Sequence, residues 1–345
     1  MRMSCQQLAG ASFDDPGDVV SWMGAIQAQD YGMSKWAVGV RLRSALGIDA
    51  VEKAFNDGRI LRTHVMRPTW HLVSPANIRW MLKLTAEHIK SCARSRDRKL
   101  EITESIYTKT NNLIENILRG HRALNLIEIA SELIPSGIVT DETRMNHLIL
   151  RAEIEGIVCS GVIKRGKPTY SLLEERVPPA RELSVEESLA RLADIYFRSH
   201  SPAGVYDFAW WSGMSIARCR QAIDLIKSSL IMDQWYGRTT WVHQSAKVSP
   251  IEGQLYTLPA FDEYVIGYKE RSSVLEMSHY HDAISAQGVF YPFIVYDGVV
   301  IGRWRKYVLG KVMSIEPSFF SGYNTVSREM FDAASERCKR FHDRL

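Results

Sequence analysis

Residues 157–172 read IVCSGVIKRGKPTYSL, and this stretch gives the clearest indication of the fold. Its two halves alternate as strands do, and the KRGK sequence between them is typical of a turn, so the stretch predicts a β-hairpin with a basic tip. An amphipathic helix pattern precedes it at residues 124–134. A second helix pattern starts after Asp141, which is suited to cap it, and ends at Gly156. Two helices followed by a hairpin are the order of a winged helix-turn-helix.

The same order is found before and after this segment. A helix-like run at residues 51–57 precedes residues 59–73, which have the β-branched and aromatic content of two strands broken at a proline. Further on, helix patterns at 189–197 and 215–227 precede a hairpin pattern at 231–242. The sequence therefore predicts three winged helices in tandem.

The C-terminal quarter is mainly strand. Residues 256–271 and 289–306 have strand patterns, with the turn sequence Asp297-Gly298 inside the second, and a charged helix pattern closes the chain. These patterns predict a small β-barrel-like domain or a curled sheet, and the fold class is α+β. The predicted domains are residues 1–120 with a helical extension, 121–183, 184–248 and 249–345.

Composition limits what the chain can be. It has 345 residues, of which 46% are hydrophobic and 24% charged, as in an ordinary globular protein. A net charge of +4 permits a polyanionic partner without requiring one. Five scattered cysteines without a C-x-x-C pair argue against a disulfide framework or a zinc site. No apolar run has the length of a signal peptide or a membrane span, so a cytoplasmic protein is expected.

A group of polar residues stands out near the start of the chain, where residues 25–32 read AIQAQDYG. A solvated helix end would explain it, because glutamine is a good helix former and aspartate is common in turns. On a helix Gln27 and Asp30 would share a face, whereas on an extended segment Gln27 and Gln29 would share one. The residues alone leave both geometries open.

Four motifs resemble the AlkZ/YcaQ-like winged-helix DNA glycosylases: residues 27–31 (QAQDY), 62–73, 258–272 and 297–306. The resemblance covers nearly the whole chain. It implies a monofunctional glycosylase that removes alkylated purines, including crosslinked ones, from duplex DNA without a metal ion or cofactor. In that family a Gln-x-Gln motif, or Gln-x-Asp in a second branch, carries the catalytic work. Gln27 and Gln29 match it, which favours the extended geometry.

The chemistry of an alkylated purine explains how two glutamine amides could catalyse its release without a carboxyl group. Glycoside hydrolysis usually needs one carboxyl group to protonate the leaving group and another as base or nucleophile. An N7- or N3-alkylated purine already carries a positive charge, so its departure needs no proton. A water must still be placed below C1′ and the oxocarbenium-like sugar stabilised. An amide can place the water by accepting from it and donating to it.

Two further residues are weaker catalytic candidates. Asp30 could supply negative charge near the sugar, although on an extended segment it would simply cap the helix that follows. His71 could take part in catalysis, although a lone histidine is more often structural.

Candidate DNA contacts come from the strand pair at 59–73 and from the tips of the two later hairpins, which would meet phosphates as wings do. The candidates are Arg62, His64, Arg67, Lys164, Arg165, Lys167 and Arg238.

Asp262 and Glu263 would point to opposite faces of a strand, so they cannot readily share a metal ion. We expect them to join the C-terminal domain to the catalytic module.

The alternative hypothesis is a transcriptional regulator that uses the same modules without chemistry. It predicts sequence-specific binding to undamaged DNA, usually by a two-fold dimer. Three dissimilar modules in one chain instead suit a monomer that wraps an asymmetric lesion. A monomeric enzyme on duplex DNA, associated with the nucleoid, is therefore the expectation.

Overall fold

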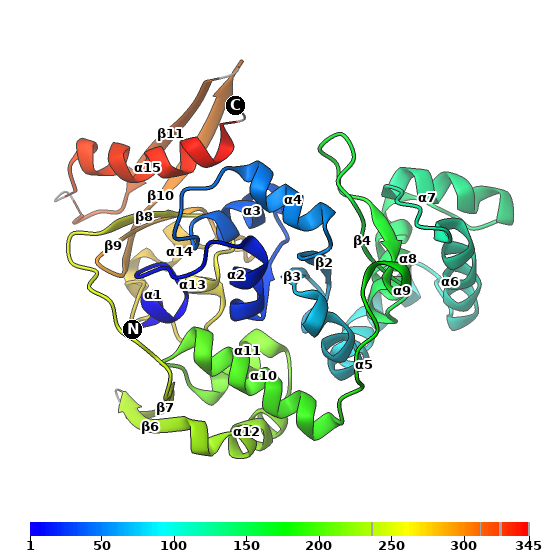
Figure 1. Ribbon diagram of the computed structural model, residues 1–345, viewed down its shortest axis with the longest axis horizontal. Coiled ribbons are helices and arrows are strands. Elements are labelled where there is room, and N and C mark those ends of the chain that lie inside the picture. The colour runs from blue at the N-terminus through cyan, green and yellow to red at the C-terminus, as the bar shows by residue number, and fades with distance from the viewer. Residues whose placement is uncertain (236, 311, 324–325, 344–345) are drawn as a thin grey trace.

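The first part of the chain forms one module with a three-stranded sheet. The computed structural model describes residues 1–345 except 236, 311, 324–325 and 344–345. The elements of this module are α1 (Arg2–Cys5), α2 (Pro16–Met23), β1 (Ala25–Gln27), α3 (Tyr31–Gly39), α4 (Ile48–Asn56), β2 (Leu61–His64) and β3 (Trp70–Val73). The strand order is β1-β3-β2, so the first strand pairs with the last. Figure 1 shows this module at the centre of the molecule, with the other parts around it.

Alternation along β1 decides which way Gln27 points. Ile26 belongs to the hydrophobic cluster on one face of the sheet, whereas Ala25 belongs to the cluster on the other face. Gln27 therefore lies on the Ala25 face, because side chains two residues apart share a face. Its antiparallel partner across the sheet is His71.

Two further modules repeat this order of elements. After α5 (Pro75–Lys99), the second module has α6 (Glu104–Leu118), α7 (Leu126–Leu133), η1 (Ile134–Ser136), α8 (Glu142–Ile154), β4 (Val158–Ser160), β5 (Tyr170–Leu172) and α9 (Leu173–Arg176). The third has α10 (Val185–His200), α11 (Val205–Ser212), α12 (Ile216–Leu225), η2 (Lys227–Ser229), β6 (Leu230–Trp235) and β7 (Arg238–His243). Between the first two helices of each, one residue bridges to the returning strand, Leu124 to Tyr170 and Ala203 to Trp241. All three modules thus share one pairing pattern.

The C-terminal sheet is open. Its elements are β8 (Leu255–Leu258), α13 (Glu263–Ile266), η3 (Met277–His279), α14 (Tyr280–Ala283), β9 (Phe293–Tyr296), β10 (Val299–Leu309), β11 (Val312–Phe319) and α15 (Arg328–His342). The strand order is β11-β10-β9-β8, and within the described ranges no pairing joins β8 to β11. The expected β-barrel is therefore wrong. Alternating strands look alike in an open sheet and in a barrel, and closure depends on strand tilt and register, which local patterns do not encode.

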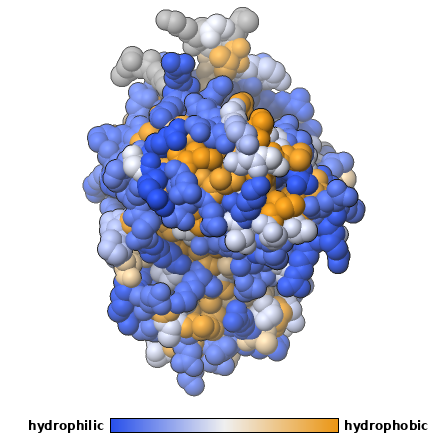
Figure 2. Space-filling view, turned by 90° about the vertical axis from the view of Figure 1, so that its right-hand side faces the viewer, coloured by the Kyte–Doolittle hydropathy of each residue, from blue (hydrophilic) through white to orange (hydrophobic). Residues whose placement is uncertain are grey.

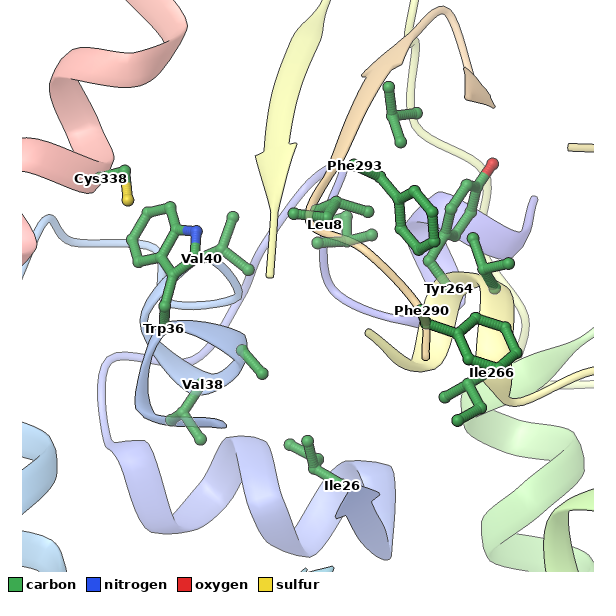
Figure 3. Packing of buried hydrophobic residues seen from close by; sticks show 14 of the residues in the cluster. Leu8, Ile26, Trp36, Val38, Val40, Tyr264, Ile266, Phe290, Phe293 and Cys338 are labelled. Atoms are coloured by element: carbon green, nitrogen blue, oxygen red, sulfur yellow. The ribbon is translucent and has the colours of Figure 1, made fainter. Parts of the chain in front are cut away.

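The first module and the C-terminal sheet share one hydrophobic cluster. Trp36 of α3 is buried in it, donates its indole N–H to the Thr257 carbonyl at 2.8 Å and has its ring centre 5.2 Å from that of Phe341. Figure 3 shows Trp36 beside Cys338 of α15, with Phe293 further along the same cluster. The C-terminal part of the chain therefore packs against α3, the helix that follows β1.

The second module exposes apolar side chains on its outer surface. Ile127, Ile134 and Val139 are each more than half exposed. Figure 2 looks onto this side of the molecule and shows apolar surface in its upper half.

Within the described part of the chain, no helix is both long and apolar enough to span a bilayer.

Candidate active site

The two glutamines lie at the end of β1 and just beyond it. Extended pairing continues past Gln27, because the Ala28 N–H donates to the Trp70 carbonyl at 2.7 Å. Asp30 then caps α3 by accepting from the Met33 N–H at 2.9 Å. Gln27 is 6% exposed, whereas Gln29 is exposed. The helical geometry is thus not found: β1 ends at Gln27, Gln29 lies in the bend that leads to α3, and Asp30 has the capping contact expected for a non-helical segment.

The Gln27 side chain has unused hydrogen-bonding capacity. Its Oε1 atom is buried and, among the described residues, has no hydrogen-bond partner. Leaving such an acceptor empty costs about 1–3 kcal/mol. Buried polar atoms of the same sheet and of the β2–β3 loop also lack partners, namely Thr63 Oγ1, Arg67 Nε, Thr69 Oγ1 and Trp70 Nε1. This concentration of unsatisfied groups is typical of a place that takes up water or a ligand.

A buried carboxylate lies beside Gln27. Glu263 is fully buried on α13, and its Oε1 atom accepts from the Gln27 main-chain N–H at 2.8 Å. Its Oε2 atom accepts from the Trp211 indole at 3.2 Å and lies 3.6 Å from His200 Nε2. As expected, this residue joins the C-terminal part to the first module. Its place beside Gln27, 236 positions away in the chain, could not be predicted from local sequence patterns.

The strand expected at Asp262 and Glu263 is instead a short helix. Asp262 caps α13 by accepting from the Tyr264 N–H at 2.9 Å, and α13 ends before Gly267. An aspartate followed by a glutamate in the first turn, with a glycine at the end, is a helix signature that could have indicated this.

His71 is buried, and its imidazole ring is neutral. Burial, together with the charge of Arg67, holds its pKa well below the usual range. Its Nδ1 atom lies 2.9 Å from the Thr69 carbonyl and so carries the proton, which leaves Nε2 to accept from Arg67 Nη2 at 3.5 Å. A neutral ring held in this way is a poor proton donor, and a catalytic role for His71 stays a prediction.

We expect the free energy of unfolding to fall as pH drops below about 6.5, where the unfolded chain protonates His71 and the folded chain does not. His200, whose pKa is also lowered by burial, adds to the same trend. Replacing His71 by Asn, which can still donate to Thr69, should lower the pH slope by up to about 1.4 kcal/mol per pH unit. Urea unfolding between pH 7.5 and 5 measures the slope, and an unchanged slope would contradict this assignment.

Two of the candidate DNA contacts are engaged inside the protein. Arg62 is 9% exposed, donates from Nε to the Ala28 carbonyl at 3.1 Å and lies 4.2 Å from the centre of the Trp70 ring. His64 is buried and contacts the Glu153 carboxylate of α8. Both join the first sheet to its surroundings, and contact of either with DNA stays a prediction.

The hairpin tips present the other candidates. Lys164 and Lys167 face each other across a turn in which Arg165 has φ +51° and Gly166 φ +73°, the geometry of a tight two-residue hairpin turn. Lys164 donates to the Ala123 carbonyl, while Arg165 and Lys167 are exposed. Arg238 of β7 forms an ion pair with Glu270.

The comparisons with known proteins agree with this architecture. A comparison with curated protein sequences finds no match. Among solved structures, the DNA glycosylase AlkZ of Streptomyces sahachiroi superposes with a TM-score of 0.81 over 100% of this chain and 96% of that one, at 21% identity. The family model described as DNA glycosylase AlkZ-like matches residues 20–341. The chain therefore belongs to the AlkZ-like DNA glycosylase family.

Proposed function

We propose that this protein hydrolyses the N-glycosidic bond of N7- or N3-alkylated purines in duplex DNA, crosslinked bases included, without a metal ion or cofactor. The observation that carries the proposal is the empty, buried Oε1 acceptor of Gln27, next to exposed Gln29 on a segment fixed by Glu263. Gln27 and Gln29 position the attacking water, with Gln27 Oε1 accepting from it.

The electrostatics of the site support a cationic leaving group. A neutral amide is too weak a base to ionise water, so the two glutamines act through position and hydrogen bonding. The Glu263 carboxylate, linked to the Gln27 main chain, adds a nearby group that favours positive charge on the sugar in the transition state. No proton donor for the base is needed.

The three repeated modules act in this proposal as winged helices, with domain boundaries near residues 120, 183 and 248. In the second module α8 is packed inward, because His147 lies 3.0 Å from Asp97 of α5 and Arg151 pairs with Glu155 and Glu104. That helix is not free to enter a major groove, so the second module meets DNA through its basic hairpin tip. The protein acts as a monomer on cytoplasmic DNA in the nucleoid.

The test is release of base from duplex DNA that contains N7-methylguanine, and from a duplex crosslinked through N7 of guanine, followed by chromatography of the free base. Wild-type protein should release the base without added metal, with chelator present as a check. A stable dimer in a molecular-mass measurement, with operator-like selectivity and no base release, would favour the regulator instead.

A further inference from the structure

Three cationic side chains surround one tryptophan. Trp210 of α11 is held by its indole N–H, which donates to the Ile266 carbonyl at 2.8 Å. The charged ends lie close to the centre of its ring, at 5.9 Å for Arg67 Cζ, 5.0 Å for Lys269 Nζ and 5.1 Å for Arg271 Cζ. The chain brings them together from the β2–β3 loop, the third module and the loop after α13. We call these four residues the Trp210 cluster.

The cluster has an excess of positive charge. Within the part of the chain that the structure describes, neither arginine nor Lys269 forms an ion pair with a carboxylate. Burial lowers the pKa of both arginines, and the charge of Arg67 lowers that of Arg271 further. Two acids lie near the cluster, Asp207 beside Arg271 and Glu263 beside Arg67, so three cations face two carboxyl groups. Asp207 already accepts from the main-chain N–H groups of Lys269 and Glu270 at 2.9 and 2.8 Å, and Glu263 from the Gln27 N–H and the Trp211 indole.

Two buried donors of the cluster have no acceptor. Arg67 Nε and Arg271 Nη2 lack hydrogen-bond partners among the described residues, although Arg271 is only 7% exposed. Arg271 Nε is engaged with the Val265 carbonyl at 3.0 Å, which fixes the direction of its guanidinium group. Lys269 is exposed, so the cluster is open to solvent on one side. Fixed, unsatisfied donors around a positive site are suited to bind an anion.

The cluster adjoins the catalytic strand. Arg67 Nη2 lies 3.5 Å from His71 Nε2, and His71 is the direct partner of Gln27 across the sheet. A cationic alkylated base would be repelled here, whereas a phosphodiester offers two oxygens to the two guanidinium groups.

We propose that Arg67, Lys269 and Arg271 bind one backbone phosphate of the strand that carries the damaged nucleotide, and so set C1′ over Gln27. This inference rests on the proposed function, because it assumes that the damaged strand lies along β1. Lys269 and Arg271 thereby join Arg67 as phosphate ligands, although neither lies in a sequence pattern typical of a DNA contact.

The test combines a protein variant with neutral phosphates. The probe is a duplex with 2′-fluoro-N7-methylguanosine, which resists cleavage, and a methylphosphonate at one flanking position at a time. Wild-type protein should bind about 10-fold more weakly when one particular phosphate is neutral. Lys269→Gln should bind the unmodified probe more weakly, lower the salt slope by about 1, and lose less affinity than wild-type protein does when that phosphate is neutral.

Control variants sharpen the result. Lys99 ends the 25-residue helix α5, about 36 Å along the axis from the end that follows β3, so Lys99→Gln should keep the wild-type pattern. Arg271→Lys keeps the positive charge but loses the two-pronged guanidinium group. Its binding should therefore still be weakened in part by the methylphosphonate at that position. If Lys269→Gln and each methylphosphonate weakened binding independently, so that their losses of binding free energy simply added at every flanking position, the proposal would be wrong. Binding requires no cleavage, so this outcome is separate from wild-type protein failing to release any base, which would refute the proposed function.

Discussion

Alanine at both Gln27 and Gln29 should slow release of N7-methylguanine about 30- to 1,000-fold, which corresponds to about 2–4 kcal/mol of lost transition-state stabilisation. The rate should fall because no amide remains to accept a hydrogen bond from the attacking water and hold it below C1′. Gln27→Ala should account for more of the effect than Gln29→Ala, because Gln27 is buried and Gln29 is exposed.

The fold should survive this change. Glu263 is bound to the Gln27 main chain, and the β1–β3 pairing also uses main-chain atoms, so an alanine side chain preserves both. Affinity for uncleaved duplex should therefore stay near that of wild type. The loss should be seen in the single-turnover rate of base release.

The measurement is single-turnover release at a fixed excess of protein, with Gln287→Ala as the control. Gln287 is an exposed glutamine in the loop before β9, so its replacement removes an amide without touching the site. If both single variants released base at the wild-type rate, the water-positioning role of the glutamines would be wrong.

Local patterns were sufficient to predict the repeated helix and hairpin segments. The hairpin at residues 157–172 and the helix that ends at Gly156 are both found, because turn and capping chemistry depend on neighbours in sequence. The capping contact of Asp30 follows from the same local chemistry. Gln27 and Gln29 came from the family resemblance, and their catalytic role stays a prediction.

Contacts between distant segments could not be predicted in this way. Arg62 and His64 look like surface cations in sequence, but the first bonds to Ala28 and the second contacts Glu153 of another module. The Trp210 cluster combines segments that lie more than 140 positions apart along the chain. A single sequence does not indicate such pairs, because spacing carries no information on which modules pack together.

Asp262→Ala should lower the free energy of unfolding by about 3–5 kcal/mol, because it leaves the charge of Arg41 buried without its partner. Both side chains are completely buried, and the two carboxylate oxygens accept from Arg41 Nη1 and Nη2 at 2.8 and 2.7 Å. The remaining contacts of Arg41, to the Ala37 carbonyl and to Gln6, are neutral and cannot replace a carboxylate. Urea unfolding monitored by tryptophan fluorescence measures the change.

A matched exposed pair provides the control. Asp14 and Arg43 form an ion pair in which both side chains are largely exposed, so Asp14→Ala should leave the unfolding midpoint close to that of wild type. The double variant Asp262→Leu/Arg41→Met, with no buried charge left over, should be more stable than Asp262→Ala. Equal midpoints for wild type and Asp262→Ala would contradict the assigned role of the pair.

The same substitution should also affect the reaction, because Glu263 follows Asp262 directly and holds the main chain of Gln27. Without its capping carboxylate α13 loses the contact to the Tyr264 N–H, so Glu263 is less firmly placed. Under conditions in which Asp262→Ala remains folded, base release should slow while duplex binding is preserved. Slower release with unchanged binding would mean that the ion pair supports the strand that carries Gln27, whereas wild-type rates from the folded variant would mean that the pair contributes to stability alone.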